Sequence, residues 1–98
     1  MATLWWNWSQ YTLSEANEDI GEVMQAIAQK LPSLGYTGVR VAGDVHGFKG
    51  DFILAVVYLH IGGRNFWQVI ACGGNGTVAA AQADVNEVSQ MISKLAFL

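Results

Sequence analysis

The feature that most constrains the fold is a central block in which strand-like runs alternate with glycine turns. The runs cover residues 37–46, 51–61 and 65–72, and they are rich in valine, isoleucine and aromatic side chains, which favour extended backbone. Residues 47–50 and the pair Gly62–Gly63 separate them, at lengths typical of hairpin connections. Because tight turns join antiparallel neighbours, the block predicts three strands of one antiparallel sheet.

The two turns also predict a register. The first turn places Val45 opposite Phe52. The second places Tyr58 opposite Trp67 and Val56 opposite Val69. An error of one residue in either turn would exchange the two faces of the sheet.

Two segments with helical periodicity flank this block. In the first, Thr12 and Glu15 have the spacing of a capping box, and apolar residues then recur every three or four positions from Leu13 to Leu31. Pro32 is expected to end this helix, because proline disfavours helical geometry at the preceding residue. In the second, the apolar positions are Val78, Ala81, Val85, Val88, Ile92 and Leu95. Asp84, Glu87 and Lys94 lie off this stripe and can face water.

Residues 3–11 are rich in aromatics and predict one further strand. The expected order is therefore β-α-β-β-β-α. Each helix has one apolar stripe to bury, so we expect an α+β two-layer sandwich, with a mainly antiparallel sheet and both helices on one face. The length of 98 residues fits a single domain over residues 1–98.

Composition and charge exclude several classes of protein. The chain is 52% hydrophobic and 13% charged, which excludes intrinsic disorder. A net charge of −3 argues against a nucleic-acid partner, because phosphate binding needs clustered Lys and Arg. We expect no membrane span, since no apolar run is long enough, and the first residues show no signal-peptide pattern. The single cysteine, Cys72, permits no internal disulfide and favours a cytoplasmic location.

The predicted strands are apolar on both faces. One face, assigned to the helices, carries Val39, Val41, Val45, Phe52, Leu54, Val56, Tyr58, Trp67, Val69 and Ala71. The other has an apolar centre of Ile53, Ala55, Val57, Leu59, Ile61, Phe66, Ile70 and Cys72, with Gln68 among them. Arg40, Asp44, His46 and Asp51 lie towards one side of it. Since a solvated face should alternate with polar residues, this second face predicts an interaction surface.

Three functions compete for this surface. The leading hypothesis is a non-catalytic domain that binds a second copy of itself through the apolar face, as a homodimer. The alternative is a protein that binds a small apolar or cationic ligand against the tryptophans near the N-terminus. The candidate ligand or interface residues are Trp5, Trp6, Trp8, Ile53, Val57, Leu59, Phe66, Gln68 and Ile70.

The third hypothesis is a small enzyme that uses His46 and Asp44. Two residues apart on a strand, these side chains share a face, and Asp51 could lie across the hairpin from His46. A polar strand end beside a turn explains the same residues more simply. His60 lies at the far end of the second run, so joint metal ligation by the two histidines is not expected, and the sequence predicts no metal and no cofactor. The glycine-rich residues 73–77 lack the pattern of a phosphate-binding loop.

Overall fold

The computed structural model describes residues 5–14, 19–50, 52–74 and 78–95 of the chain. Five strands and two helices follow one another as β1 (Trp5–Ser14), α1 (Ile20–Ser33), β2 (Thr37–Val41), β3 (Asp44–Lys49), β4 (Phe52–Ile61), β5 (Arg64–Gly74) and α2 (Ala79–Leu95). The predicted α+β class is confirmed, with one strand more than expected between the helices.

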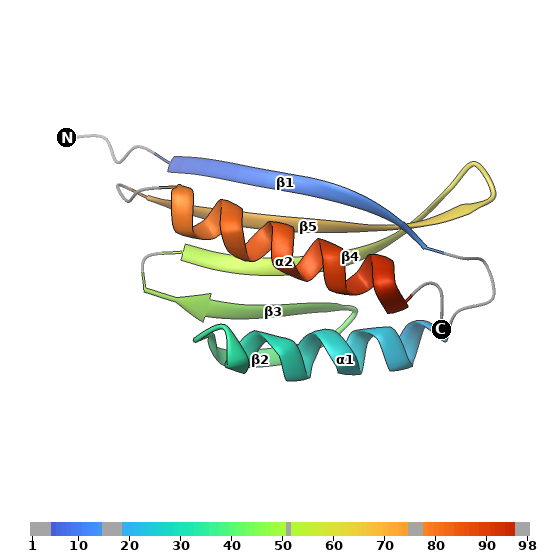
Figure 1. The fold of residues 1–98 in the computed structure, drawn as a ribbon, viewed down its shortest axis with the longest axis horizontal. Helices are drawn as coiled ribbons and strands as arrows, with labels where there is room; N and C mark the ends of the chain where they lie inside the picture. Colours follow the sequence, from blue (N-terminus) through green and yellow to red (C-terminus); the bar gives the residue numbers. More distant parts are fainter. Residues whose placement is uncertain (1–4, 15–18, 51, 75–77, 96–98) are drawn as a thin grey trace.

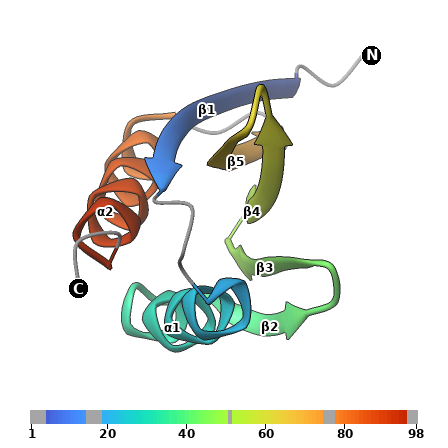
Figure 2. The same ribbon diagram turned by 90° about the vertical axis from the view of Figure 1, so that its right-hand side faces the viewer.

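All five strands form one antiparallel sheet in the order β1-β5-β4-β3-β2 (Figure 1). β1 and β2 are the two edges, and α1 carries the chain from one edge to the other. Figure 2 looks along the strands and shows both helices on the same side of a strongly twisted sheet. The molecule is therefore the two-layer sandwich that the two apolar helix stripes predict.

The extra strand arises because the predicted run 37–46 is a hairpin. Gly43 has φ of +80°, a conformation open to glycine, and Ala42 N–H donates to the Asp44 carbonyl at 2.9 Å, which closes the turn. β2 then pairs with β3, with Arg40 opposite His46. As a consequence β3 continues to Lys49, and Gly47 lies within a strand and not in a loop.

The predicted register of the next hairpin is wrong by four residues. Val45 lies opposite Val56, and Lys49 is the residue opposite Phe52, because the turn is confined to the two residues that follow Lys49. Gly50 has φ of +56° and supplies the tight bend. The error is an even number of residues, so each side chain keeps its predicted face. In the β4–β5 hairpin, the predicted pairs Tyr58–Trp67 and Val56–Val69 are confirmed.

The first helix begins later than the sequence predicts. Thr12 belongs to β1, where it is buried opposite Trp67, while Glu15 lies outside the described residues. Continuous pairing of β1 with β5 outweighs the local capping pattern at Thr12. The actual N-cap is Asp19, whose Oδ1 accepts from the Glu22 N–H at 3.1 Å.

Pro32 lies inside the last turn of α1 and not after it. The helix ends one residue later, at Ser33. The N–H groups of Leu34 and Tyr36 both donate to the Leu31 carbonyl, and Gly35 N–H donates to the Pro32 carbonyl. These bonds satisfy the carbonyls of Leu31 and Pro32 at the end of the helix.

The core lies between the helices and one sheet face. Its buried apolar residues are Val23, Ile27, Leu31, Tyr36, Val45, Leu54, Val56, Trp67, Val69, Ala71, Ala81, Val85, Val88 and Ile92. The predicted stripe of α2 is thus confirmed at Ala81, Val85, Val88 and Ile92. Val41 does not join this core, because it lies on the edge strand β2 with its side chain 42% exposed.

The expectation that Asp84 faces water is wrong. Its carboxylate, on α2, is buried, and its Oδ2 accepts hydrogen bonds from the Tyr36 hydroxyl and from Nζ of Lys49, each at 2.9 Å. These partners come from the segment after α1 and from the end of β3. Helical periodicity alone could not place them beside α2.

Candidate interaction surface

The side of the sheet that faces away from the helices is the candidate site, and we call it the open sheet face. The strand register assigns to it Asn7, Ser9 and Tyr11 of β1, Arg64, Phe66, Gln68, Ile70 and Cys72 of β5, Ile53, Ala55, Val57, Leu59 and Ile61 of β4, and Asp44, His46 and Phe48 of β3. Within the part of the chain that the structure describes, no helix or further strand lies over this face (Figure 2). The predicted surface residues of β4 and β5 are therefore neighbours on one uncovered surface.

The centre of the open sheet face is apolar. Seven of its side chains come from the two middle strands and are half-buried by one another: Ile53, Ala55, Val57, Leu59, Phe66, Ile70 and Cys72. Gln68 is the polar side chain among them. A sheet face in contact with water normally alternates with polar residues along each strand. The centre of this face therefore has the character of a surface that another apolar surface covers.

Two exposed aromatic rings border this centre on opposite sides. Phe48 on β3 is 48% exposed, and Tyr11 on β1 is 59% exposed. Tyr11 is held in place by Gln68, whose Nε2 donates to the phenolic oxygen at 3.0 Å. Aromatic residues that remain about half exposed, as these two do, are typical of interfaces.

The polar side of the face contains the predicted histidine–carboxylate pair. Nδ1 of His46 lies 3.3 Å from Oδ2 of Asp44, and the imidazole contacts the Phe48 ring edge-on at a centroid distance of 6.0 Å. The strand neighbours of His46 are Arg40 on β2 and Ala55 on β4. Neither of these two cross-strand neighbours carries the nucleophilic group that nucleophilic catalysis requires.

The sequence predicts a second carboxylate, Asp51, across the hairpin from His46. Asp51 lies outside the described residues, and the position across the hairpin from His46 belongs to Ala55. The carboxylate that the structure places beside the imidazole is Asp44 alone among the described side chains.

His60 belongs to a separate cluster near the tip of the β4–β5 hairpin. Its Nδ1 lies 2.8 Å from Oδ1 of Asn65, which also accepts a hydrogen bond from the Tyr58 hydroxyl. Because an amide oxygen only accepts, this contact assigns the imidazole proton to Nδ1. The register places His60 on the helix side of the sheet, across from the face that carries His46. Among the described residues, no group of three His, Cys, Asp or Glu could hold a metal ion.

The tryptophans do not form one cluster on the open sheet face. Trp8 lies opposite Ala71, on the helix side of the edge strand β1, and is 43% exposed. Trp67 is fully buried under the helices. The backbone of Trp5 and Trp6 pairs with Gly74 and Gly73, and their side chains lie outside what the structure describes.

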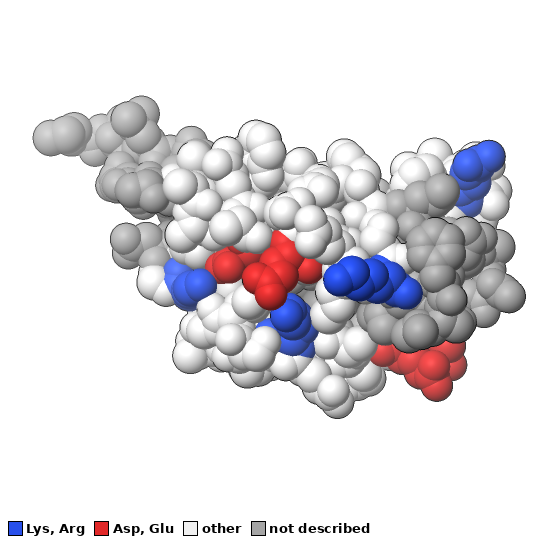
Figure 3. Space-filling view, in the orientation of Figure 1, with Lys and Arg blue, Asp and Glu red and all other residues white. Residues whose placement is uncertain are grey.

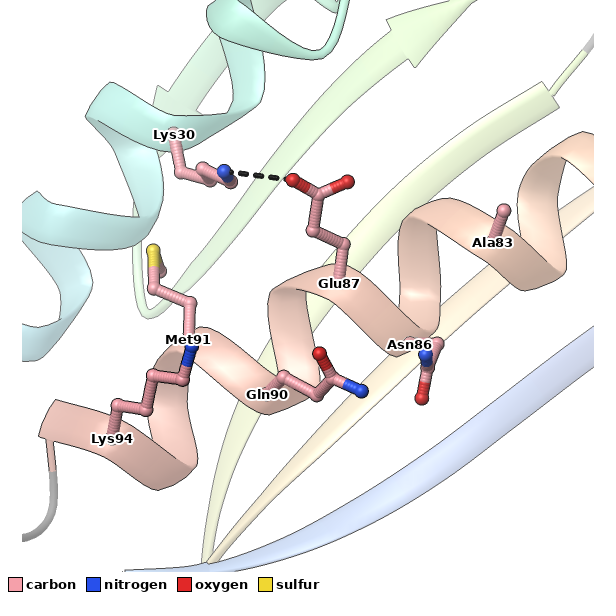
Figure 4. Close-up of a pocket in the computed structure, with 7 residues that line it drawn as sticks. All are labelled: Lys30, Ala83, Asn86, Glu87, Gln90, Met91 and Lys94. Carbon is pink, nitrogen blue, oxygen red and sulfur yellow. Dashed lines mark hydrogen bonds and ion pairs between the residues drawn. The ribbon is translucent and has the colours of Figure 1, made fainter.

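A cleft of about 480 Å³ opens on the opposite side of the molecule, between the two helices (Figure 4). It is lined by Lys30, Ala83, Asn86, Glu87, Gln90, Met91 and Lys94. Nζ of Lys30 forms an ion pair with Oε1 of Glu87 at 3.0 Å. Figure 3, which views this side, shows acidic and basic side chains together over the helices. None of the site residues that the sequence predicts lines this cleft, and the half-exposed Lys30–Glu87 pair is typical of a solvated surface.

Comparisons with models of known families, with characterised proteins and with solved structures gave no match to this chain. None of the described helices is both long enough and apolar enough to cross a membrane.

Proposed function

We propose that this chain acts by binding and not by catalysis, as a domain that self-associates through its open sheet face. The observation that supports this proposal is the apolar centre formed by β4 and β5, which no described element covers. Leaving apolar surface in water is unfavourable by about 25 cal/mol per Å². A second copy of the same face would cover it, with the two sheets about 10 Å apart.

The size of the face suits a dimer. Strands of five to eleven residues, at a rise of about 3.3 Å per residue and a spacing of about 4.8 Å, give a projected area of roughly 650 Å². Side-chain relief makes the accessible area larger than this projection. Stable interfaces bury about 800 Å² on each partner, so the face is of the size that a specific dimer needs.

The distribution of charge favours a second copy as the occupant. Each chain carries a net charge of −3, and two copies repel one another unless they meet where the charges are absent. The centre of the open sheet face is such a place, because Asp44 and Arg40 lie on one side of it and Arg64 lies at the tip of the β4–β5 hairpin. The single cysteine supports a reducing compartment such as the cytoplasm for this activity.

The test compares two valine variants of the full chain by sedimentation equilibrium. Val57→Lys places an ammonium group at the centre of the open sheet face, beside Asp44, its partner on β3. In the monomer the ammonium group can extend from this half-buried position into solvent and pair with Asp44, so the fold is spared. In the dimer it is buried, which we expect to weaken association by about 3 kcal/mol, or roughly 100-fold.

Val41→Lys is the matched control, because Val41 is exposed on the helix side of β2. We expect wild type and Val41→Lys to sediment as oligomers at micromolar concentration, and Val57→Lys to shift towards smaller species. A wild-type chain that sediments at 10.6 kDa under these conditions overturns the proposal. Unchanged association in Val57→Lys, with its melting temperature preserved, also contradicts it.

A further inference from the structure

The two edges of the sheet are built very differently. β1 spans ten residues and pairs with β5 at every position from Trp5 to Ser14, without a register shift (Figure 1). Its outer side has no partner strand among the described residues. Every second residue of such an edge turns its backbone N–H and C=O groups outward, where they can template another strand.

The opposite edge carries the protections that natural sheets use against such pairing. β2 has only five residues, and its register shifts between Thr37 and Arg40. It contains Gly38, with φ of +62°, and the charged Arg40. Short length, irregularity and charge all discourage the addition of a further strand.

β1 has none of these protections. Its sequence, WWNWSQYTLS, contains no charged residue, no proline and no glycine. It also carries two large exposed side chains, one on each side of the sheet. Trp8 is 43% exposed on the helix side, and Tyr11 is 59% exposed on the open side. A strand added at this edge would cover part of both rings and satisfy the outward backbone groups together.

We propose that β1 pairs antiparallel with β1 of a second copy, so that two five-stranded sheets join into one of ten strands. A two-fold axis perpendicular to the sheet would relate the copies, with all four helices on the same side. In this arrangement each β1 residue lies opposite a β1 residue of the second copy that belongs to the same side of the sheet. With Ser9 on the axis, for example, Trp8 lies opposite Gln10 of the second copy.

The absence of charge on β1 favours a second copy over an unrelated extended peptide. The uncharged β1 is its own complement in an antiparallel pair, so two chains of net charge −3 meet there without opposing like charges. The pairing also makes the open sheet face continuous across both copies. The edge contact is made by backbone groups and not by the open sheet face, so it can form whether or not two open sheet faces associate. If both contacts form, the assembly has four chains.

Residue-resolved hydrogen exchange of the full chain tests this pairing directly. The outward amides of β2 are an internal control, because they belong to the protected edge of the same molecule. We expect the outward amides of β1 to exchange at least roughly tenfold more slowly than those of β2 at high protein concentration. This protection should disappear on dilution, as the copies separate.

A pair of glutamine variants provides the matched comparison. Gln10→Lys puts a charge on β1 on the helix side, away from the open sheet face, whereas Gln25→Lys puts the same charge on an exposed position of α1. Both variants keep Val57, so the open sheet face is intact in each. We expect Gln10→Lys to abolish the slow hydrogen exchange of the outward β1 amides and Gln25→Lys to retain it.

Three outcomes would overturn the inference. In the first, the outward amides of β1 exchange as fast as those of β2 at every concentration. In the second, protection persists at every dilution, which would indicate cover from within the same chain. In the third, Gln10→Lys leaves the protection intact. If Val57→Lys no longer associates through the open sheet face but its outward β1 amides still exchange slowly, the edge contact forms independently of the proposed face-to-face dimer.

Discussion

The Tyr36 hydroxyl donates a hydrogen bond of 2.9 Å to Oδ2 of Asp84, a residue 48 positions further along the chain. Nζ of Lys49 reaches the same oxygen at 2.9 Å and lies 5.3 Å from the centre of the Tyr36 ring. The three residues come from the segment after α1, from β3 and from α2. This buried polar cluster therefore holds α2 against the half of the sheet that contains β2 and β3.

Removal of the Tyr36 hydroxyl should destabilise the fold. In Tyr36→Phe the ring and its edge contact with Phe52 remain, but Asp84 loses one of its two described donors. We expect the free energy of unfolding to fall by about 1–2 kcal/mol, measured by urea denaturation. Tyr11→Phe is the control, because Tyr11 is exposed and its loss should cost less than about 0.5 kcal/mol. Equal losses in the two variants would show that the buried hydrogen bond adds no stability.

Stability should also fall in alkaline solution because of the same residue. Burial, and the neighbouring Asp84 carboxylate, raise the pKa of Tyr36 well above its ordinary value of 10.0. Above pH 10 the unfolded chain releases the phenolic proton and the folded chain keeps it, so unfolding becomes easier by up to about 1.4 kcal/mol per pH unit. Denaturation at a series of pH values from 9 to about 11 measures this slope. Tyr36→Phe should reduce it, and an unchanged slope would contradict the assignment.

Two acidic residues of α2 that pair with lysines should differ greatly in their contributions. Asp84 is 11% exposed and Glu87 is 51% exposed at the side chain. Asp84→Asn leaves Lys49 without its charge partner in a partly buried setting and should cost about 2–3 kcal/mol. Glu87→Gln breaks a solvated pair with Lys30 and should cost at most about 0.5 kcal/mol, less in high salt. Thermal melts of both variants at two ionic strengths measure these losses. A larger loss in Glu87→Gln than in Asp84→Asn would contradict the prediction.

Gly47 is a position where a single methyl group should be costly. A Cβ there would lie 3.1 Å from Cγ2 of Val39 and 3.2 Å from Cβ of Tyr36, closer than ordinary packing allows. We expect Gly47→Ala to destabilise the chain by about 1–3 kcal/mol through overpacking. An unchanged unfolding midpoint would indicate that β2 moves aside without loss.

Cys72 can report on the proposed dimer. Its thiol is half-buried on the open sheet face, opposite Ile53 and beside the apolar centre. We expect a maleimide to label it more slowly in the wild type at high concentration than in Val57→Lys, because association would cover it. The labelling rate of Val41→Lys should match that of the wild type. Equal rates in all three chains would count against burial of this face.

The strongest local patterns in the sequence predict the fold class correctly. The three- and four-residue spacing of apolar positions in α2 is carried into the core at Ala81, Val85, Val88 and Ile92. The glycine pair between β4 and β5 also gives the correct pairing of Tyr58 with Trp67. These features depend on periods and turns within a few residues, which sequence records directly.

The errors arise where distant contacts outweigh local preference. Thr12 has the spacing of a helix cap, but its pairing with β5 keeps it in a strand, and the cap falls to Asp19. The hairpin at Gly43 was missed because one glycine within a valine-rich run is a weak turn signal. Asp84 on the solvent side of a helical stripe becomes buried because Tyr36 and Lys49 arrive from elsewhere in the chain.

The sequence by itself determined that the middle strands are apolar on both faces, since alternation along each strand depends only on residue order. The tertiary structure decided the order of the strands in the sheet and which side chains join the polar cluster around Asp84. It also decided that β1 is a long, regular and uncharged edge. These features depend on which strands become neighbours, and strand order follows from the packing of the whole chain and not from any local pattern.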